Sequence, residues 1–151
     1  MNRAARYWLT IGAVLGFLGV ALGAFGAHGL ERVFQSWDLN PAEFAKRMQN
    51  WEVAVRYQMY HALALLAVGL LAEHKRSRWL TWAGVMFGLG VLVFSGCLYA
   101  YALTGVRVLG TVVPIGGVSL LAGWLALAVA LTARQEPRPP ATTPKPGSAK
   151  K

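Results

Sequence analysis

Residues 7–30 read YWLTIGAVLGFLGVALGAFGAHGL and contain no Asp, Glu, Lys or Arg. Three further uncharged stretches follow, at residues 57–72, 79–106 and 108–133. A helix that crosses a bilayer core of about 30 Å needs about 20 apolar residues. The sequence therefore predicts an all-α fold, an integral membrane four-helix bundle with four spans, in the cell inner (plasma) membrane.

The composition supports a membrane protein rather than a soluble one. Of the 151 residues, 56% are hydrophobic and 14% are charged, whereas about 25% of a soluble domain is charged. The net charge of +9 would suggest nucleic-acid binding if the basic residues were spread along the chain. They lie instead between the uncharged stretches and in the C-terminal tail, so we expect membrane lipids and no nucleic acid as partners. A single cysteine, Cys97, excludes an intrachain disulfide framework.

The positions of the basic residues predict which side of the membrane each end occupies. Lys and Arg are held on the cytoplasmic side, and the short loop with Lys75, Arg76 and Arg78 gives the strongest indication. Both termini are therefore predicted to be cytoplasmic.

The domain organisation is predicted to be simple. The first apolar run is longer than the core of a secretory signal, so we expect a retained first helix. Residues 1–134 are predicted to form one four-span transmembrane domain. Residues 135–151 are rich in Pro and Lys, which predicts a disordered cytoplasmic tail.

Small residues follow one face of the first span. Gly12, Gly16, Gly19 and Gly23 are spaced four, three and four residues apart, which places them on the same side of a helix. Glycines in such a row let a neighbouring helix approach closely in lipid. We interpret them as helix-packing residues, and the alternative is a glycine-lined pore wall.

An amphipathic interfacial segment is predicted between the first and second helices. Asn40, Pro41 and Glu43 have the pattern of an N-cap, a first helical residue and a reciprocal cap. Downstream, Phe44 and Trp51 fall at helical spacing, which favours a segment that lies at the outer interface and leads into the second span. A partner-binding face is the alternative.

The fourth span contains Pro114 followed by Gly116 and Gly117. Proline removes a backbone donor and distorts a helix. We therefore expect the first turns of this span to be kinked or locally irregular, and we count these three residues among the helix-packing positions.

Polar side chains gather in the outer half of the predicted bundle. At 1.5 Å per residue, His61 and Ser95 both lie about 12 Å inside the outer boundary. The candidate cluster consists of His28, Arg56, Tyr57, Gln58, His61, Ser95 and Tyr99. Polar residues within spans are costly and suggest function, although interhelical hydrogen bonds also lock membrane helices together. We interpret the cluster as a hydrogen-bonded clasp, formed among these side chains or with carbonyls freed by Pro114.

Three functional alternatives for the cluster stay open. His28 and His61 are candidate ligands of a haem or a metal, but the bundle offers no third or fourth histidine. A proton or solute path needs a polar route into the inner half, which the sequence does not show. Cys97 and His61 are a candidate nucleophile and base, but no orienting acid is evident. We therefore predict that the chain has no catalytic residue, no metal site and no cofactor, and that it is not an enzyme.

Four motifs give the chain a resemblance to a known family. They are GAFGAHGL at residues 23–30, VRYQMYHALALL at 55–66, FSGCLY at 94–99 and PIGG at 114–117. In this order they resemble the YgdD/YwdK-like family of small multi-pass membrane proteins, and the resemblance covers about Arg6 to Ala133. It implies a four-helix inner-membrane protein and supplies no catalytic residues. The chain departs from the family pattern at Cys97, where Ser is more usual, and at Val113, where Thr often precedes the proline.

Two hypotheses about function follow from these observations. The first is a non-enzymatic accessory or assembly subunit of a larger membrane complex, or a self-associating bundle, whose partner is a membrane protein or a second copy. Its basis is the small size, the glycine row and the lack of a catalytic constellation. The alternative is a small transporter or ligand-binding bundle with a polar site around His28, Arg56 and His61.

Overall fold

The computed structural model describes residues 1–133, which are almost entirely helical. The elements are α1 (Arg3–Phe25), the π-helical turn η1 (Gly26–Leu30), α2 (Glu31–Gln35), α3 (Pro41–His74), α4 (Arg78–Thr104) and α5 (Arg107–Thr132). Four helices, the first running continuously from α1 through η1 to α2, are long and apolar enough to span a membrane. Residues 1–133 contain no strand. The predicted all-α four-span architecture is confirmed, and the predicted tail at 135–151 lies outside the described residues.

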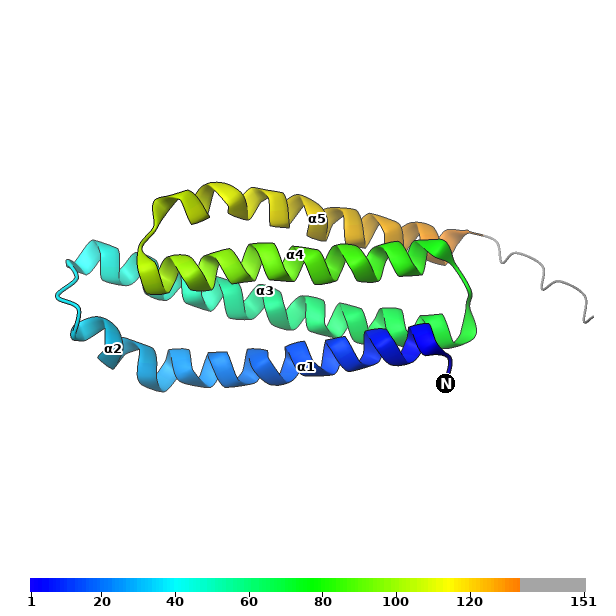
Figure 1. Ribbon diagram of the computed structural model, residues 1–151, viewed down its shortest axis with the longest axis horizontal. Helices are drawn as coiled ribbons and strands as arrows, with labels where there is room; N and C mark the ends of the chain where they lie inside the picture. The colour runs from blue at the N-terminus through cyan, green and yellow to red at the C-terminus, as the bar shows by residue number, and fades with distance from the viewer. Residues whose placement is uncertain (134–151) are drawn as a thin grey trace, which may run out of the picture.

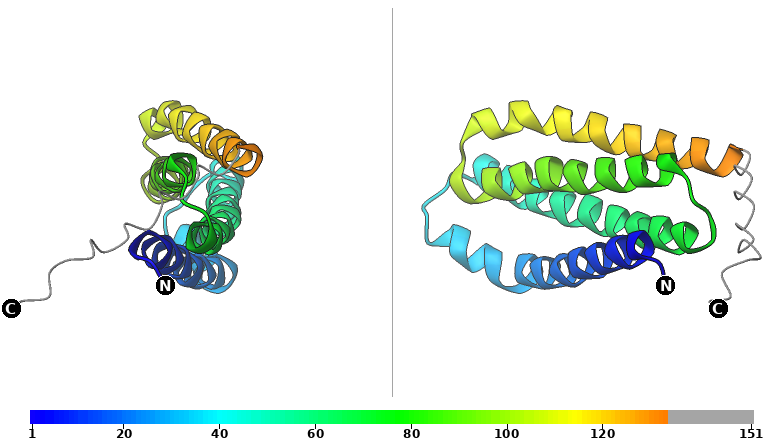
Figure 2. Two further views of the ribbon diagram at one scale, coloured as in Figure 1. Left: turned by 90° about the vertical axis from the view of Figure 1, so that its right-hand side faces the viewer. Right: turned by 45° about the vertical axis from the view of Figure 1, so that its right-hand side comes forward.

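The helices pack mainly against their neighbours in chain order, and α1 and α5 do not close the bundle by packing on each other. α1 packs along α3, α3 along α4, and α4 along α5. Seen end on, α1 and α5 lie on the outer sides and α3 and α4 lie between them (Figure 2). The N-terminus, the α3–α4 connection and the end of α5 share one end of the bundle (Figure 1), which we call the termini end. The opposite end, with the α1–α3 and α4–α5 connections, is the loop end.

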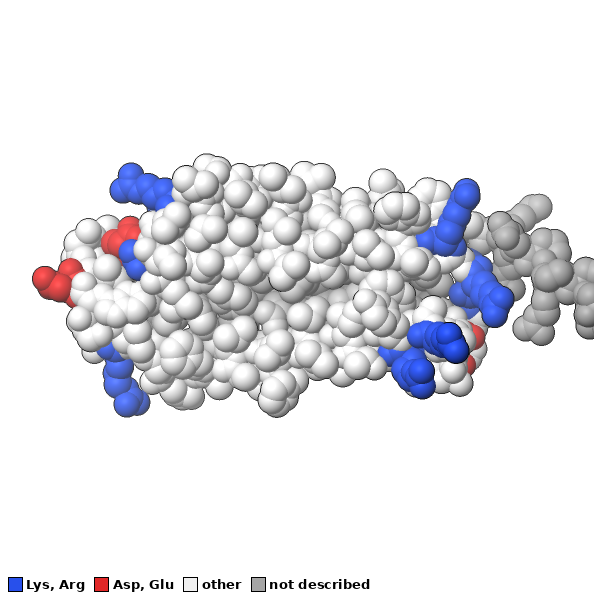
Figure 3. All heavy atoms as spheres, viewed as in Figure 1, with Lys and Arg blue, Asp and Glu red and all other residues white. Residues whose placement is uncertain are grey.

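One face of the bundle carries its charged side chains at these two ends. On the face shown in Figure 3, Lys, Arg, Asp and Glu cluster at the termini end and the loop end and leave an uncharged band between them. Such a band is the surface that a bilayer core requires. The spans therefore contact membrane lipid along their length.

The start of α3 agrees with the predicted cap. The Asn40 side chain accepts a hydrogen bond from the Glu43 N–H at 2.9 Å, and Pro41 is the first helical residue. The Glu43 carboxylate does not reach back to the cap, because it accepts a hydrogen bond from Arg47 Nε at 3.0 Å. α3 then continues unbroken into the second span.

The apolar face of the amphipathic segment packs in part on protein. A small core forms around the buried Leu30 of η1, Phe34 of α2 and Trp51 of α3. Phe44 packs against this core, with its ring 6.1 Å from that of Phe34. Part of the apolar face that the sequence assigned to the lipid interface is therefore used inside the chain.

The glycine row of α1 lies mostly against α3. A Cβ added at Gly12 would come within 2.9 Å of the Ala62 carbonyl oxygen, and one at Gly19 within 2.5 Å of Met59 Sδ. Gly23 is looser, because its Cβ would be 3.3 Å from Val55 Cγ1. Gly16 differs from the expectation, since no atom of residues 1–133 outside its own helix neighbourhood lies within 4 Å of its Cβ position.

α5 packs on α4 through glycines on both helices. A Cβ at Gly116 would lie 2.5 Å from the backbone nitrogen of Phe94, whereas one at Gly117 would lie 3.8 Å from the Phe94 ring. Pro114 lies inside α5 without ending it, since the helix extends from Arg107 to Thr132. The predicted irregularity is limited to a bend of the ribbon over its first turns (Figure 1).

Candidate functional site

Gln58 connects three helices at the centre of the polar cluster. Its side chain is 4% exposed, and its Nε2 donates to the Leu15 carbonyl of α1 at 2.8 Å. Its Oε1 accepts from the Tyr99 hydroxyl of α4 at 3.0 Å. A residue of α3 thus holds both neighbouring helices, and it can do so because Gly19 leaves room for the amide, whose Nε2 lies 3.5 Å from the Gly19 Cβ position.

Ser95 forms a second link between α3 and α4. It is 1% exposed, and its hydroxyl donates to the Ala54 carbonyl oxygen at 2.9 Å. In a helix interior that carbonyl already accepts the hydrogen bond of the backbone N–H one turn later. Ser95 therefore supplements the helix rather than replacing one of its bonds.

His61 extends the cluster to α5. It is 4% exposed, and its Nε2 accepts from the Trp124 indole N–H at 3.2 Å. An indole N–H is only a donor, so Nε2 carries no proton. Nδ1, which lies 2.7 Å from the Tyr57 carbonyl oxygen, then carries the proton and donates it. This geometry assigns His61 as the neutral imidazole with Nδ1 protonated.

The buried polar side chains satisfy one another or the backbone. Within residues 1–133, every buried side-chain nitrogen or oxygen has a hydrogen-bond partner. The carbonyls used belong to Leu15, Ala54 and Tyr57, not to the turn that precedes Pro114. The arrangement therefore leaves no free buried side-chain donor or acceptor within residues 1–133 to bind a solute or to transfer a proton.

The structure separates the predicted cluster into a buried part and an exposed part. His28 lies in η1 at the loop end, and Arg56 lies on α3; both side chains are exposed. Neither forms a hydrogen bond or ion pair within the described part of the chain. The Tyr57 ring is 38% exposed and packs on Phe94 at 4.5 Å between centroids. His28 and Arg56 are therefore not linked to His61 by hydrogen bonds within residues 1–133.

Metal and thiol chemistry gain no support from the geometry. No three His, Cys, Asp or Glu side chains group together among residues 1–133. Both ring nitrogens of His61 are engaged, which leaves none to ligate a metal or to deprotonate Cys97. Cys97 itself is half-buried on α4.

Three interhelical contacts were not predicted from the sequence. They are the Trp124 bond to His61, the Trp51 indole bond to the Leu22 carbonyl at 3.0 Å, and the Lys75 ammonium bonds to the Ala130 and Ala133 carbonyls at 2.6 and 2.8 Å. A signal existed for Trp124, because tryptophan is usual at membrane interfaces and this one lies well inside the fourth span. No sequence signal pairs Lys75 with the end of α5.

Comparison with known proteins places the chain in a family. A family described as "Protein of unknown function (DUF423)" matches residues 22–117. A UPF0382 membrane protein of Staphylococcus haemolyticus is 42% identical over 124 residues, which cover 82% of this chain and 93% of the relative. The chain belongs to this family. The resemblance inferred from the four motifs is thereby confirmed.

Two further DUF423/UPF0382 relatives show the same extent of similarity. A UPF0382 membrane protein of Staphylococcus epidermidis is 43% identical over 125 residues, covering 83% of this chain and 94% of the relative. The UPF0382 inner membrane protein YgdD of Escherichia coli is 37% identical over 126 residues, covering 83% and 88%. No solved structure matches the chain. The region that matches the DUF423 family includes Gln58, His61, Ser95 and Tyr99, whereas Trp124 lies beyond it.

Proposed function

We propose that the protein is a non-enzymatic accessory or assembly subunit of a larger complex in the bacterial inner membrane. The location follows the printed name of the Escherichia coli relative, an inner membrane protein. The role follows from where the chain leaves space for another helix. Its interior offers no unpaired polar group within residues 1–133, so its outer surfaces are the better candidates for function.

The observation that carries the proposal is a notched face on α4. Gly88 and Gly96 have no atom of the described residues within 4 Å of their Cβ positions beyond their own helix neighbourhood. Between them Leu92 projects and is 70% exposed. These residues follow one another at intervals of four, so they lie along one side of the helix. A protruding Leu between two notches is a surface onto which a partner helix can pack closely in lipid.

The α1 surface adds to this argument. The span that contains α1 is the least covered of the four, since 17% of its apolar stretch is buried inside the protein. Gly16 on this helix is a further open glycine. Because glycine packs no side chain against lipid, its use at such positions favours contact with another helix.

The test compares open glycines on different helices. Gly88→Leu/Gly96→Leu fills the two notches of α4, while Gly110→Leu fills an open position near the start of α5 and serves as the matched control. All proteins are cross-linked in native membranes and purified in mild detergent, and co-purifying chains are quantified. We expect a stoichiometric companion or second copy with the wild type and with Gly110→Leu, reduced at least about tenfold in the double variant.

Two results would contradict the proposal. One is a wild-type protein that remains a monomer without a companion after cross-linking. The other is a double variant that keeps its companion at the wild-type level. If the double variant unfolds at the same temperature as the wild type, misfolding is excluded as the cause of a lost companion.

A further inference from the structure

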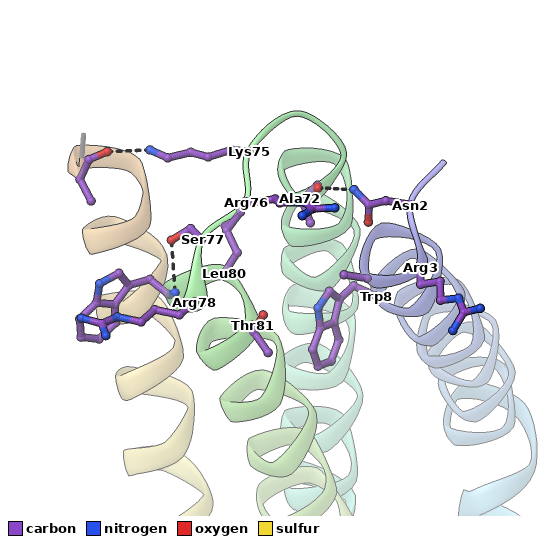
Figure 4. A pocket seen from close by; sticks show the side chains of 13 residues that line it. Asn2, Arg3, Trp8, Ala72, Lys75, Arg76, Ser77, Arg78, Leu80 and Thr81 are labelled. Atoms are coloured by element: carbon purple, nitrogen blue, oxygen red, sulfur yellow. Dashed lines mark hydrogen bonds between the residues drawn. The ribbon is translucent and has the colours of Figure 1, made fainter. Parts of the chain in front are cut away.

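A cavity of about 690 Å³ opens at the termini end of the bundle. It lies between the start of α1, the end of α3 and the start of α4 (Figure 4). Its lining includes Arg3, Trp8, Arg76, Arg78, Leu80 and Thr81. Figure 4 shows the Arg76 side chain over the middle of the opening, whereas Arg3 points outward from α1 and Arg78 extends toward α5, where its guanidinium lies 5.8 Å from the Trp79 ring centroid. The cavity thus combines Arg76 over its opening, two further arginines in its lining, and an interior partly built of apolar side chains.

The three arginines lack acidic partners. Within residues 1–133 the ion pairs are those of Glu73 with the N-terminal amine and of Glu43 with Arg47. Lys75, which also lines the cavity, has its ammonium bonded to carbonyls at the end of α5. The positive charge at the opening is therefore uncompensated within the described chain, which favours an anionic ligand.

Two helix N-termini reinforce the positive field. α1 and α4 both begin at this cavity. The first N–H groups of a helix have no acceptor within the helix, and the Asn2 and Ser77 side chains accept one of them in each helix. The positive end of each helix dipole also points toward the opening. Neither first turn contains an acidic residue, although acids are favoured there. Together with the arginines, this arrangement suits a phosphate group.

The floor of the cavity distinguishes a lipid from a free anion. Trp8 is 6% exposed and Leu80 2% exposed, and both are packed into the main core. Trp79 and Trp82, at 37% and 55% exposure, stand at the same end of α4, where tryptophans mark the boundary between membrane and water. An apolar floor at this depth can cover the glycerol and the first methylenes of a lipid, whereas a free phosphate would gain nothing from it.

We propose that this cavity binds the phosphate headgroup of an anionic phospholipid, with Arg76 over the phosphate and Arg3 and Arg78 adding positive charge from the adjoining starts of α1 and α4. Basic pockets between transmembrane helices are known to hold such headgroups. The ligand would link α1 to α4, two helices that otherwise pack mainly on α3 and α5.

The test measures lipid binding to the purified full chain by native mass spectrometry. The probes are phosphatidylglycerol, phosphatidylcholine and inorganic phosphate. Arg76→Gln is compared with Arg107→Gln, which removes an equal charge from a smaller cavity of about 370 Å³ lined by Lys46 and Tyr101. We expect phosphatidylglycerol to bind about fivefold more weakly to Arg76→Gln and about a hundredfold more weakly to Arg3→Gln/Arg76→Gln/Arg78→Gln, at about one arginine's electrostatic contribution each. Arg107→Gln should change the affinity less than about twofold.

Several outcomes would overturn the proposal. Equal losses in Arg76→Gln and Arg107→Gln would show attraction to overall charge rather than a site. Equal binding of phosphatidylcholine would remove the role of the arginines. Inorganic phosphate binding as tightly as the lipid would assign the cavity to a free anion. The single variant Arg76→Gln, on an exposed side chain, keeps the test decisive if the triple variant fails to fold.

Discussion

The middle of the bundle and its termini end use polar side chains in opposite ways. In the middle, the buried Gln, His and Ser side chains bond to neighbouring helices until no buried donor or acceptor within residues 1–133 is free. At the termini end, three arginines line a cavity without an acidic partner in that part of the chain. The first arrangement is closed and the second is open.

The contrast follows from the surroundings of each region. A polar group at membrane depth has no water to bond with, so it must be satisfied inside the protein. A guanidinium at the water boundary stays hydrated and can exchange water for a ligand. A polar residue deep in a span suggests a function. Where its polar atoms all have partners within the protein, as those of His61 do, a structural role explains it instead.

The largest expected effect tests whether the middle is as tightly closed as its contacts indicate. Gly116→Ala places a Cβ 2.5 Å from the backbone nitrogen of Phe94, where no side chain can move aside. We expect a loss of about 1–3 kcal/mol in the free energy of unfolding. Gly110→Ala, at an open position of the same helix, should be neutral or slightly stabilising because alanine favours the helix. Unfolding in mixed micelles checks both, and equal stabilities would contradict the packing described here.

The next prediction removes the link among three helices. Gln58→Leu replaces the amide side chain with an apolar one and loses the hydrogen bonds to Leu15 and Tyr99. We expect the bundle to lose about 1–2 kcal/mol, since each interhelical hydrogen bond in a membrane contributes about 0.6 kcal/mol and the Tyr99 hydroxyl is left unpaired. The same unfolding assay measures the loss. A variant as stable as the wild type would argue that the clasp has no structural role.

A smaller effect is expected where α5 joins the cluster. Trp124→Phe keeps an aromatic ring but removes the donor to His61, which should cost about 0.6 kcal/mol. Trp82→Phe, on a 55% exposed side chain, is the matched control and should leave the stability unchanged. Identical values for the two variants would contradict the assigned hydrogen bond.

The smallest effect concerns the exposed members of the predicted cluster. His28→Gln and Arg56→Gln alter surface side chains, so each should change the free energy of unfolding by no more than about 0.5 kcal/mol. They should also leave the interior hydrogen bonds intact. A loss comparable to that of Gln58→Leu would place these residues back in the cluster.

Much of the fold was predictable from the sequence because membrane spans depend on local properties. Uncharged runs, the Asn40 cap with Pro41, and the spacing of Gly12 and Gly19 are all features of one segment at a time. The same is true of the polar positions Gln58, His61 and Ser95, which stand out against apolar neighbours.

The partners of those residues were not predictable for the complementary reason. Pairing His61 with Trp124 depends on how α5 is placed and rotated relative to α3, and no pattern within either helix fixes that arrangement. The packing of Phe34 and Trp51 in one small core depends on the turn at residues 36–38, which lets α3 fold back against the end of the first span. The cavity at the termini end likewise requires Arg3 and Arg76, far apart in sequence, to meet through the packing of α1 along α3.

The most direct test of the closed middle is nitrogen-15 NMR of the His61 and Trp124 side chains in the reconstituted protein at neutral pH. The structure predicts a neutral imidazole with the proton on Nδ1, an unprotonated Nε2, and a Trp124 indole N–H that exchanges with water far more slowly than that of Trp82. A His61 ring protonated at Nε2, together with a rapidly exchanging Trp124 N–H, would contradict the account. The middle of the bundle would then be open to water and to a ligand.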